Sequence, residues 1–216
     1  MIGRVCETCP VTTLAVVQAR MTSTRFPGKV LASLLGQPMI IRQLERIARA
    51  QLIDTLIVAT STDSGDDELV KVLESADYRV FRGSLEDVLE RFIGAVDHFE
   101  MESGEIADSV VRLTADCPLT SPTVIDDVIR AFSESGSDYL SNTMTPTFPD
   151  GLDVEVVRTR VLREVAKLAV DPPDGLGHHG IGYQACAGRP AKPLVVAAGG
   201  DTPRMRQMAC TPELLA

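Results

Sequence analysis

The sequence lacks an excess of basic residues: 21 Lys and Arg residues stand against 30 Asp and Glu residues, and the formal net charge is −9. Proteins that bind nucleic acid polymers normally present a basic surface to the phosphates. We therefore expect no nucleic acid polymer as a partner. A few clustered cations can still bind a small anion.

Cysteine is scarce, and its five positions are an odd number spread along the chain: Cys6, Cys9, Cys117, Cys186 and Cys210. Small secreted domains instead carry dense, paired cysteines. We expect reduced thiols and a cytoplasmic protein. Cys6 and Cys9 form a C-x-x-C, but no second pair stands at zinc-finger spacing, which favours an incidental pair over a metal or redox site.

Long apolar runs are also missing, since none approaches the roughly 20 residues that cross a bilayer. The stretch 11–19 is short, is interrupted by polar residues and has no basic cluster before it. It is typical of a first buried strand rather than of a signal peptide. We expect no membrane partner.

The chain length of 216 residues allows one substantial core and is short for two enzyme domains. We expect a single domain over residues 1–216, with a flexible tip at 1–12. Repeated Pro and Gly leave no periodicity in the region 171–190, which predicts a loop or a disordered segment.

Short apolar runs alternate with amphipathic helical patterns through the first two thirds of the chain. Strands are predicted at 14–17, 55–59 and 109–113, with a weaker one at 78–81, and the clearest helical stripe runs from Leu85 to Phe99. This alternation predicts an α/β fold, a mostly parallel sheet with helices on both faces. Ligands bind such sheets beyond the carboxyl ends of the strands.

The loop after the first strand, residues 18–29, carries Arg20, Arg25 and Lys29 and a Pro-Gly turn. Arginine chelates phosphate oxygens and lysine supplies a mobile point charge, so the loop is predicted to bind an anion. A solvated basic loop is the alternative. Neither G-x-x-x-x-G-K-[ST] nor G-x-G-x-x-G occurs here, which excludes a P-loop or a dinucleotide fingerprint.

The segment 19–31, Ala-Arg-Met-Thr-Ser-Thr-Arg-Phe-Pro-Gly-Lys-Val-Leu, followed by Gly-Gln-Pro-Met at 36–39, resembles the opening motif of cytidylyltransferases. These enzymes activate acidic sugars such as Kdo and sialic acid, and the motif is most like that of the spore-coat polysaccharide branch. The resemblance implies a GT-A-like nucleotide-diphospho-sugar transferase fold and a homodimer. It also implies transfer of CMP from CTP to a sugar hydroxyl, with release of pyrophosphate.

The resemblance assigns the nucleotide site to three loops. Arg20, Arg25 and Lys29 would grip the triphosphate, and Arg20 and Lys29 are also expected to be catalytic. The full set of predicted nucleotide-binding residues is Ala19, Arg20, Ser23, Arg25, Gly28, Lys29, Thr60, Ser61, Gly83 and Ser84. Nearby, Arg91 is as compatible with a surface salt bridge as with a ligand contact, and Asp87 with a solvent-facing side chain.

Asp116 ends the third predicted strand in an Asp-Cys-Pro turn, where a metal ion could bridge it to phosphate oxygens. A helix N-cap aspartate is the alternative. The resemblance favours a catalytic, Mg²⁺-binding carboxylate, because the matching Asp-x-Pro turn carries one.

Three further residues, Asn142, Asp153 and Glu155, resemble the branch's pattern and are weaker candidates for sugar binding. Asp153 and Glu155 alternate along a predicted strand and could meet one ligand, contribute to a second metal site, or face water. A partly buried structural role is expected for His98. Metal binding by the adjacent His178 and His179 is not favoured, because neighbouring side chains point apart.

Near the end of the chain, Cys210 stands where the family motif has a second metal-binding aspartate. A catalytically impaired nucleotide-binding homologue is therefore an alternative, with Asp153 a possible substitute ligand. A nucleotide-sugar-dependent glycosyltransferase would normally need an Asp-x-Asp motif, which this sequence lacks. The sequence does not name the sugar or fix the base preference.

Overall fold

The computed structural model describes residues 11–22, 26–143, 148–168, 194–197 and 206–209. Residues 1–10 of the tip expected at 1–12, and the loop expected at 171–190, lie outside these ranges. Residues 11 and 12 belong to the first strand, which begins at Val11, and so are not part of a flexible tip. In chain order the elements are β1 (Val11–Gln18), η1 (Lys29–Leu31), β2 (Ser33–Leu34), β3 (Gln37–Pro38), α1 (Met39–Ile47), β4 (Thr55–Ser61), η2 (Ser64–Asp66), α2 (Asp67–Ser75), β5 (Arg79–Gly83), α3 (Val88–Ser103), β6 (Ile106–Thr114), α4 (Pro122–Ser135), β7 (Tyr139–Ser141), β8 (Glu155–Arg158), α5 (Thr159–Leu168), β9 (Leu194–Ala197) and β10 (Arg206–Ala209).

One large sheet organises the described part of the chain, with eight strands in the order β10-β9-β7-β8-β6-β1-β4-β5. The strands β6, β1, β4 and β5 are mutually parallel, whereas β8 pairs antiparallel with both β6 and β7. The prediction of a single α/β domain with a mostly parallel sheet is confirmed. The alternating pattern at 152–157 predicted a strand there but not its reversed direction.

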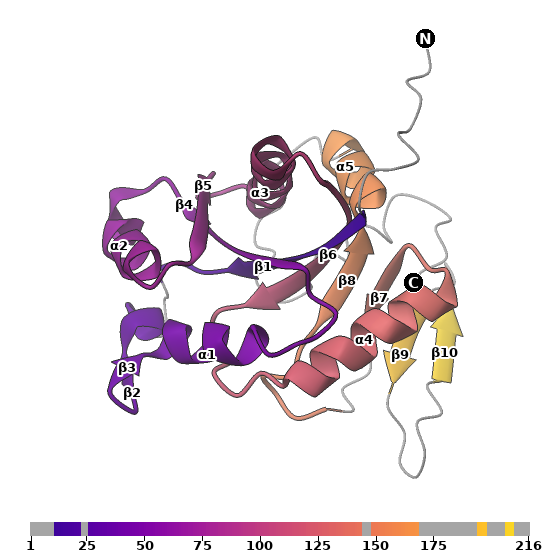
Figure 1. Cartoon of the computed structure of the whole chain (residues 1–216), viewed down its shortest axis with the longest axis horizontal. Coiled ribbons are helices and arrows are strands. Elements are labelled where there is room, and N and C mark those ends of the chain that lie inside the picture. Colours follow the sequence, from indigo (N-terminus) through magenta and orange to yellow (C-terminus); the bar gives the residue numbers. More distant parts are fainter. Residues whose placement is uncertain (1–10, 23–25, 144–147, 169–193, 198–205, 210–216) are drawn as a thin grey trace.

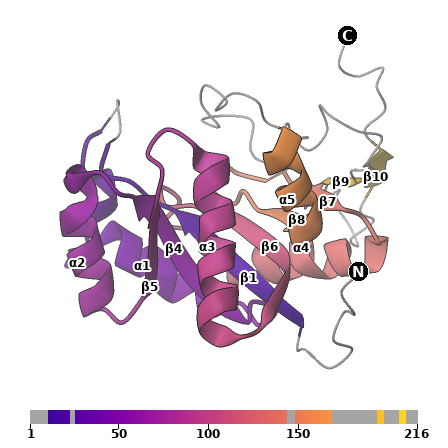
Figure 2. The same cartoon turned by 90° about the horizontal axis from the view of Figure 1, so that it is seen from above.

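The helices form a layer on each side of this sheet, as Figure 1 shows, with α1 and α4 below it and α3 and α5 above. The view from above confirms the arrangement, because α3 and α5 lie in front of the strands (Figure 2). Within the described residues, no helix is long and apolar enough to cross a membrane.

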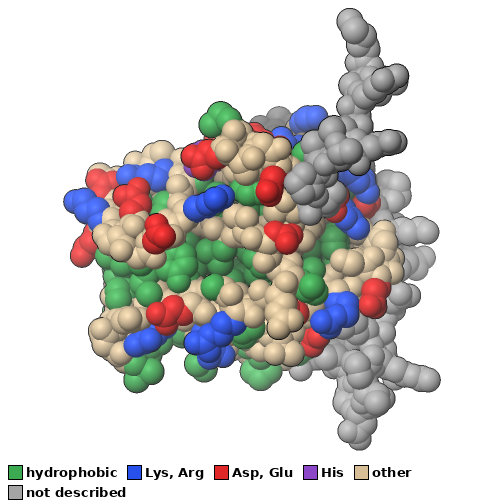
Figure 3. Space-filling view, in the orientation of Figure 1, with side chains coloured by type: hydrophobic (Ala, Val, Ile, Leu, Met, Phe, Trp, Pro, Cys, Tyr) green, Lys and Arg blue, Asp and Glu red, His purple; other side chains and the backbone are tan. Residues whose placement is uncertain are grey.

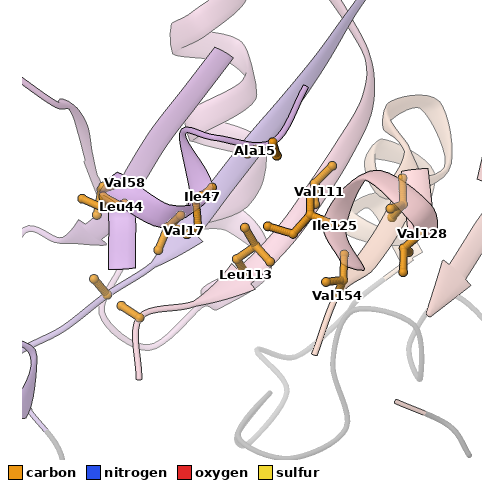
Figure 4. Packing of buried hydrophobic residues seen from close by; sticks show 14 of the residues in the cluster. Ala15, Val17, Leu44, Ile47, Val58, Val111, Leu113, Ile125, Val128 and Val154 are labelled. Carbon is orange, nitrogen blue, oxygen red and sulfur yellow. The ribbon is translucent and has the colours of Figure 1, made fainter. Parts of the chain in front are cut away.

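Two apolar clusters fill the spaces between the sheet and its helices. The first joins α1 and α4 to the sheet, and Figure 4 shows Leu44 and Ile47 of α1 together with strand residues such as Val17. The second joins α3 and α5 to the opposite face, with members that include Phe92 and Leu162. Alternate residues of β1 supply both clusters, as expected for a strand buried on both faces.

The helices cover the first apolar cluster incompletely on one side. In Figure 3, apolar side chains gather in a band across the left half of the face, over the region of α1, α2 and β5, with charged side chains above and below. Half-buried Val72, Tyr78 and Val80 pack against the cluster. This end of the sheet therefore keeps part of its apolar layer near the surface.

Strand register brings the predicted ligand loops to one edge. Gln18, the last residue of β1, pairs with Ala59 of β4 on one side and with Thr114 of β6 on the other. Ser61 at the end of β4 pairs with Gly83 at the end of β5. The loops that follow these four strands consequently meet.

Helix α3 packs closely on β5 through a glycine. A Cβ added at Gly94 would lie 2.5 Å from Phe81 Cζ and 2.8 Å from its Cε1. Any side chain at this position would therefore push the Phe81 ring away, and that ring also contacts His98 at a centroid distance of 5.7 Å.

Gly94→Ala tests this contact. Alanine in place of glycine normally stabilises a helix interior by about 1 kcal/mol. Here we expect the crowded ring to reverse the sign and to lower the free energy of unfolding by about 1–2 kcal/mol, measured by urea denaturation. In a Phe81→Leu background the same change should cost at least about 0.5 kcal/mol less. Equal costs in the two backgrounds would show that the ring is not the obstacle.

Candidate functional site

The loop after β1 is held at both ends by backbone hydrogen bonds. Ala19 N–H donates to Ala59 O at 3.1 Å, and Gly28 N–H donates to Met21 O at 2.9 Å. Gly28 adopts a left-handed φ of +71°, which favours glycine at this turn. Arg20 is exposed in this loop, while the predicted ligands Ser23 and Arg25 lie outside the described residues.

Lys29 and Asp116 form an ion pair between the loops after β1 and β6. Lys29 Nζ lies 2.9 Å from Asp116 Oδ2, and the two side chains keep 26% and 42% of their surface exposed. Burial alone would raise the pKa of Asp116, but hydrogen bonds from Lys29, Thr114 and Cys117 and the charge of Lys29 outweigh it, so its pKa is lowered. Two residues that sequence reasoning placed in one site thus do meet, as an accessible ion pair.

The loop after β4 is organised by Asp66, which sequence reasoning missed. Its buried carboxylate accepts hydrogen bonds from Met21 N–H at 2.7 Å, from Thr60 Oγ1 at 2.9 Å, and from both the N–H and the hydroxyl of Ser61. Burial acts to raise the pKa of Asp66, but these hydrogen bonds together lower it. The sequence feature that could have pointed to Asp66 was the pair Asp66-Asp67, which stands just before the apolar residues of α2.

Thr60 and Ser61 were predicted to contact the nucleotide. Both are buried, and their hydroxyls are used by Asp66. Their side chains therefore help to hold the loop after β4 in place. A direct contact with base or ribose remains a prediction.

The loop after β5 carries Gly83 and Ser84. A Cβ at Gly83 would lie 2.9 Å from Phe81 Cε1 and 3.2 Å from Arg91 Cα, so this glycine permits close packing of β5 on α3. Ser84 Oγ accepts from Asp87 N–H at 3.0 Å, and Asp87 Oδ1 accepts from Glu90 N–H at 2.9 Å. Asp87 is thus the N-cap of α3 rather than an unattached surface carboxylate.

Arg91 lies in the interior, which corrects the surface salt bridge considered from the sequence. The side chain is completely buried, and Nη1 donates to Ser84 O at 2.5 Å. Nε and Nη2 have no hydrogen-bond partner in the structure as described. Burial and the positive charge of Arg20 lower the pKa of Arg91, whereas Asp66 and neighbouring carboxylates oppose them. The guanidinium therefore sits within electrostatic reach of the first two loops.

A sequence model of the cytidylyltransferase family matches residues 14–169, most of the chain. The chain belongs to this family. The spore coat polysaccharide biosynthesis protein SpsF of Bacillus subtilis is 34% identical over 159 residues, which cover 72% of this chain and 62% of SpsF. The 3-deoxy-manno-octulosonate cytidylyltransferase of Pelobacter propionicus is 38% identical over 124 residues, covering 57% of this chain and 45% of that protein.

A solved cytidylyltransferase from Leptospira borgpetersenii shares the fold, with a TM-score of 0.76 and 24% identity over 93% of this chain and 82% of that one. This cytidylyltransferase-family chain spans about six tenths of the length of SpsF. The family and the fold are therefore shown, while activity and substrates are matters for proposal.

Of the three weaker candidates for sugar binding, Asp153 interacts electrostatically with Asp116, and the other two are engaged in internal contacts. Asn142 is buried, donates to Leu152 O at 2.8 Å and accepts from Val154 N–H at 2.8 Å, which joins the end of β7 to the segment before β8. Glu155 is buried, forms an ion pair with Arg112, and accepts from Tyr139 OH at 3.0 Å. These contacts join β6, β7 and β8 to one another.

Asp153, by contrast, is exposed and just precedes β8. Partial loss of hydration and the negative charges of Asp150 and Glu155 raise its pKa, with Arg112 opposing and Asp116 contributing. Asp153 is therefore the candidate sugar-side carboxylate that remains accessible, and its role in binding remains a prediction.

Asp116 is the described residue that best fits a magnesium ion. No group of three or more His, Cys, Asp or Glu side chains within the described ranges could hold a metal by itself. Mg²⁺, however, is commonly held by one or two carboxylates together with substrate phosphates and water. An accessible carboxylate of lowered pKa beside a lysine has the chemistry for that arrangement. Cys210, His178 and His179 lie outside the described residues.

Cys117, next to Asp116, carries a free, partly buried thiol. Burial, first, and the negative charges of Asp116 and Asp153 raise the pKa of its thiol to about 11. The thiol is therefore protonated near neutral pH.

His98 has the structural role expected, since it contacts Phe81 and lies 3.5 Å from Glu102 on the same helix.

Asp66→Asn tests the buried carboxylate that joins two loops. Its pKa in the folded state lies below the ordinary value of 3.8. Its stabilising contribution is therefore fully present above about pH 4 and is lost as the pH falls through the lower folded value. We expect Asp66→Asn to cost about 2 kcal/mol at pH 7, measured by urea denaturation, and the gap to wild type to narrow toward pH 3.

The matched control is Asp63→Asn, since exposed Asp63 accepts a hydrogen bond from Gly65 N–H that an Asn oxygen can also accept. It should change stability by less than about 0.5 kcal/mol at both pH values. A gap for Asp66→Asn that stays constant between pH 7 and pH 3 would contradict the electrostatic role.

Proposed function

We propose that this chain transfers CMP from CTP to a hydroxyl of an acidic or nonulosonic sugar, with release of pyrophosphate, for surface polysaccharide biosynthesis. The observation that carries the proposal is the contact between Lys29 and Asp116 at the carboxyl edge of the parallel sheet. Membership of the cytidylyltransferase family supports it. The relatives named for spore coat polysaccharide and for 3-deoxy-manno-octulosonate support a sugar acceptor.

In the proposed reaction the acceptor hydroxyl oxygen attacks the α-phosphorus of CTP. A new P–O bond forms, the bond from the α-phosphorus to the bridging oxygen breaks, and pyrophosphate leaves with the electron pair. The hydroxyl proton passes to a phosphate oxygen of the substrate or to water, since no described side chain is assigned as its base. Catalysis of such a transfer rests on positioning and charge stabilisation.

The chain's own residues divide these tasks. Lys29, fixed in place by Asp116, presents a cation to the phosphates, and Arg20 adds a second from the same loop. Asp116, with its lowered pKa, would hold Mg²⁺. When bound, this ion neutralises phosphate charge and orients the triphosphate. Asp153, an exposed carboxylate, would contact the acceptor sugar.

Two further expectations accompany the proposal: a homodimer, which the family resemblance implies, and a cytoplasmic location, which the scattered cysteines favour. Size measurement of the full chain by light scattering would test the first. A monomer at micromolar concentration would remove the homodimer from the proposal without affecting the chemistry.

Lys29→Ala tests the nucleotide site. Removal of a charge-assisted contact to phosphate should weaken CTP binding about 10–100-fold, measured by isothermal titration calorimetry without added metal. Lys71→Ala, which removes an exposed lysine from α2, should bind CTP as the wild type does. Unchanged affinity in Lys29→Ala would refute the assignment of the loop.

Asp116→Asn tests the carboxylate that pairs with Lys29. Pyrophosphate release should be followed with CTP, GTP, UTP or ATP and a panel of acidic sugars, with and without Mg²⁺. We expect wild type to prefer CTP and to require the ion, and Asp116→Asn to lose about 100-fold or more in rate while it still binds CTP without metal. Wild-type CTP binding with no turnover on any sugar would favour a catalytically impaired homologue.

A further inference from the structure

Gln43 is a buried amide on α1 whose polar atoms meet the loop that carries Asp116. The side chain is completely buried. Its Nε2 donates to Thr114 O at 2.7 Å and to Thr120 Oγ1 at 3.3 Å, and its Oε1 accepts from Cys117 N–H at 3.3 Å. Both ends of the amide are thus satisfied by groups that bracket Asp116 in sequence.

Further contacts close the same loop. Thr120 Oγ1 donates to Cys117 O at 2.6 Å, and Arg46, one turn after Gln43 on α1, donates through Nε to Thr120 O at 2.9 Å. Ala115 N–H donates to the strand-end carbonyl of Gln18 at 3.0 Å. The backbone around Asp116 is therefore fastened on one side to β1 and on the other to α1.

Helix α1 also continues from the segment that begins at Lys29. Ala32 N–H donates to Lys29 O at 3.1 Å, and Met39 N–H, at the first residue of α1, donates to Ala32 O at 2.9 Å. Leu44 and Ile47 fix the helix on the sheet (Figure 4). Hydrogen bonds and apolar packing therefore connect Lys29, through α1, to the loop that carries Asp116.

The placement of Gln43 interrupts an otherwise apolar face. Its neighbours Ile40, Leu44 and Ile47 are all fully buried. An amide in such a place is unfavourable unless its groups are bonded, so an apolar residue would serve a purely packing role more simply. The three hydrogen bonds instead fix the position of the loop relative to α1.

We propose that Gln43 is a positioning residue, which fixes the Asp116 carboxylate opposite Lys29 and thereby sets its affinity for a divalent cation. This inference rests on the proposed function and deepens it. Groups that hold a metal-binding side chain from behind commonly change metal affinity about 10–100-fold when they are removed.

The test compares Gln43→Met, which keeps the side-chain length but removes all three hydrogen bonds, with Glu45→Gln. Glu45 lies on the same helix and pairs with Arg42, away from the loop. The first measurement is amide hydrogen exchange at Cys117, whose N–H is bonded to Gln43. We expect exchange about tenfold faster or more in Gln43→Met and unchanged in Glu45→Gln.

The second measurement is Mn²⁺ binding by the full chain with CTP present, followed by the electron paramagnetic resonance of free Mn²⁺, because it needs no turnover. Gln43→Met should bind Mn²⁺ about 10–100-fold more weakly than wild type, while its metal-free affinity for CTP stays within about twofold. A structural role alone would lower the melting temperature and leave Mn²⁺ affinity unchanged.

Three results would overturn the inference. The first is an Mn²⁺ affinity of Gln43→Met within twofold of wild type, and the second is a loss of metal-free CTP affinity in this variant that parallels its loss of Mn²⁺ affinity. The third is the absence of Mn²⁺ binding by wild type. Failure of the proposed function has a different signature. Wild type would then release no pyrophosphate from CTP with any sugar, while the Mn²⁺ difference between wild type and Gln43→Met persisted.

Discussion

The position of β1 between β4 and β6 is the constraint on which the site depends. Both neighbours run parallel to β1, and their registers bring Gln18 level with Ala59 and Thr114. Because parallel strands end at the same edge, the loops that carry Lys29, Asp66 and Asp116 are brought together by the backbone ladder before any side chain interacts. Two apolar layers then hold that ladder from both faces.

Buried polar side chains give the loops their shape once the sheet has placed them. Asp66 binds the backbone of Met21 and Ser61, Gln43 binds that of Thr114 and Cys117, and Asn142 binds that of Leu152 and Val154. Loop backbone has no ladder to satisfy its donors and acceptors, so a buried polar side chain does so instead. In a low-dielectric interior these bonds are directional and costly to leave unmade.

The sequence predicted the features that follow from periodicity and from local motif. The strands, the sheet's carboxyl edge, and the presence of Lys29 and Asp116 at that edge could all be inferred. Asp66 and Gln43 could not, because a polar residue beside an apolar stripe does not reveal which backbone groups it will meet. A surface salt bridge was one of two interpretations of Arg91, because charged side chains are rarely buried completely. The engagement of Glu155 by Arg112 and Tyr139 likewise depends on the antiparallel pairing of β8.

The carboxylate of Asp66 has a consequence for how such proteins can be rebuilt. It holds the loop after β1 and the loop after β4 through one buried group, with Thr60 as a further donor. A loop transplanted from a relative must place its donors where this carboxylate requires them, because a buried carboxylate without partners is destabilising. Loop exchange between family members should therefore replace Met21, Thr60, Ser61 and Asp66 together, although Met21 is far from the other three in the chain.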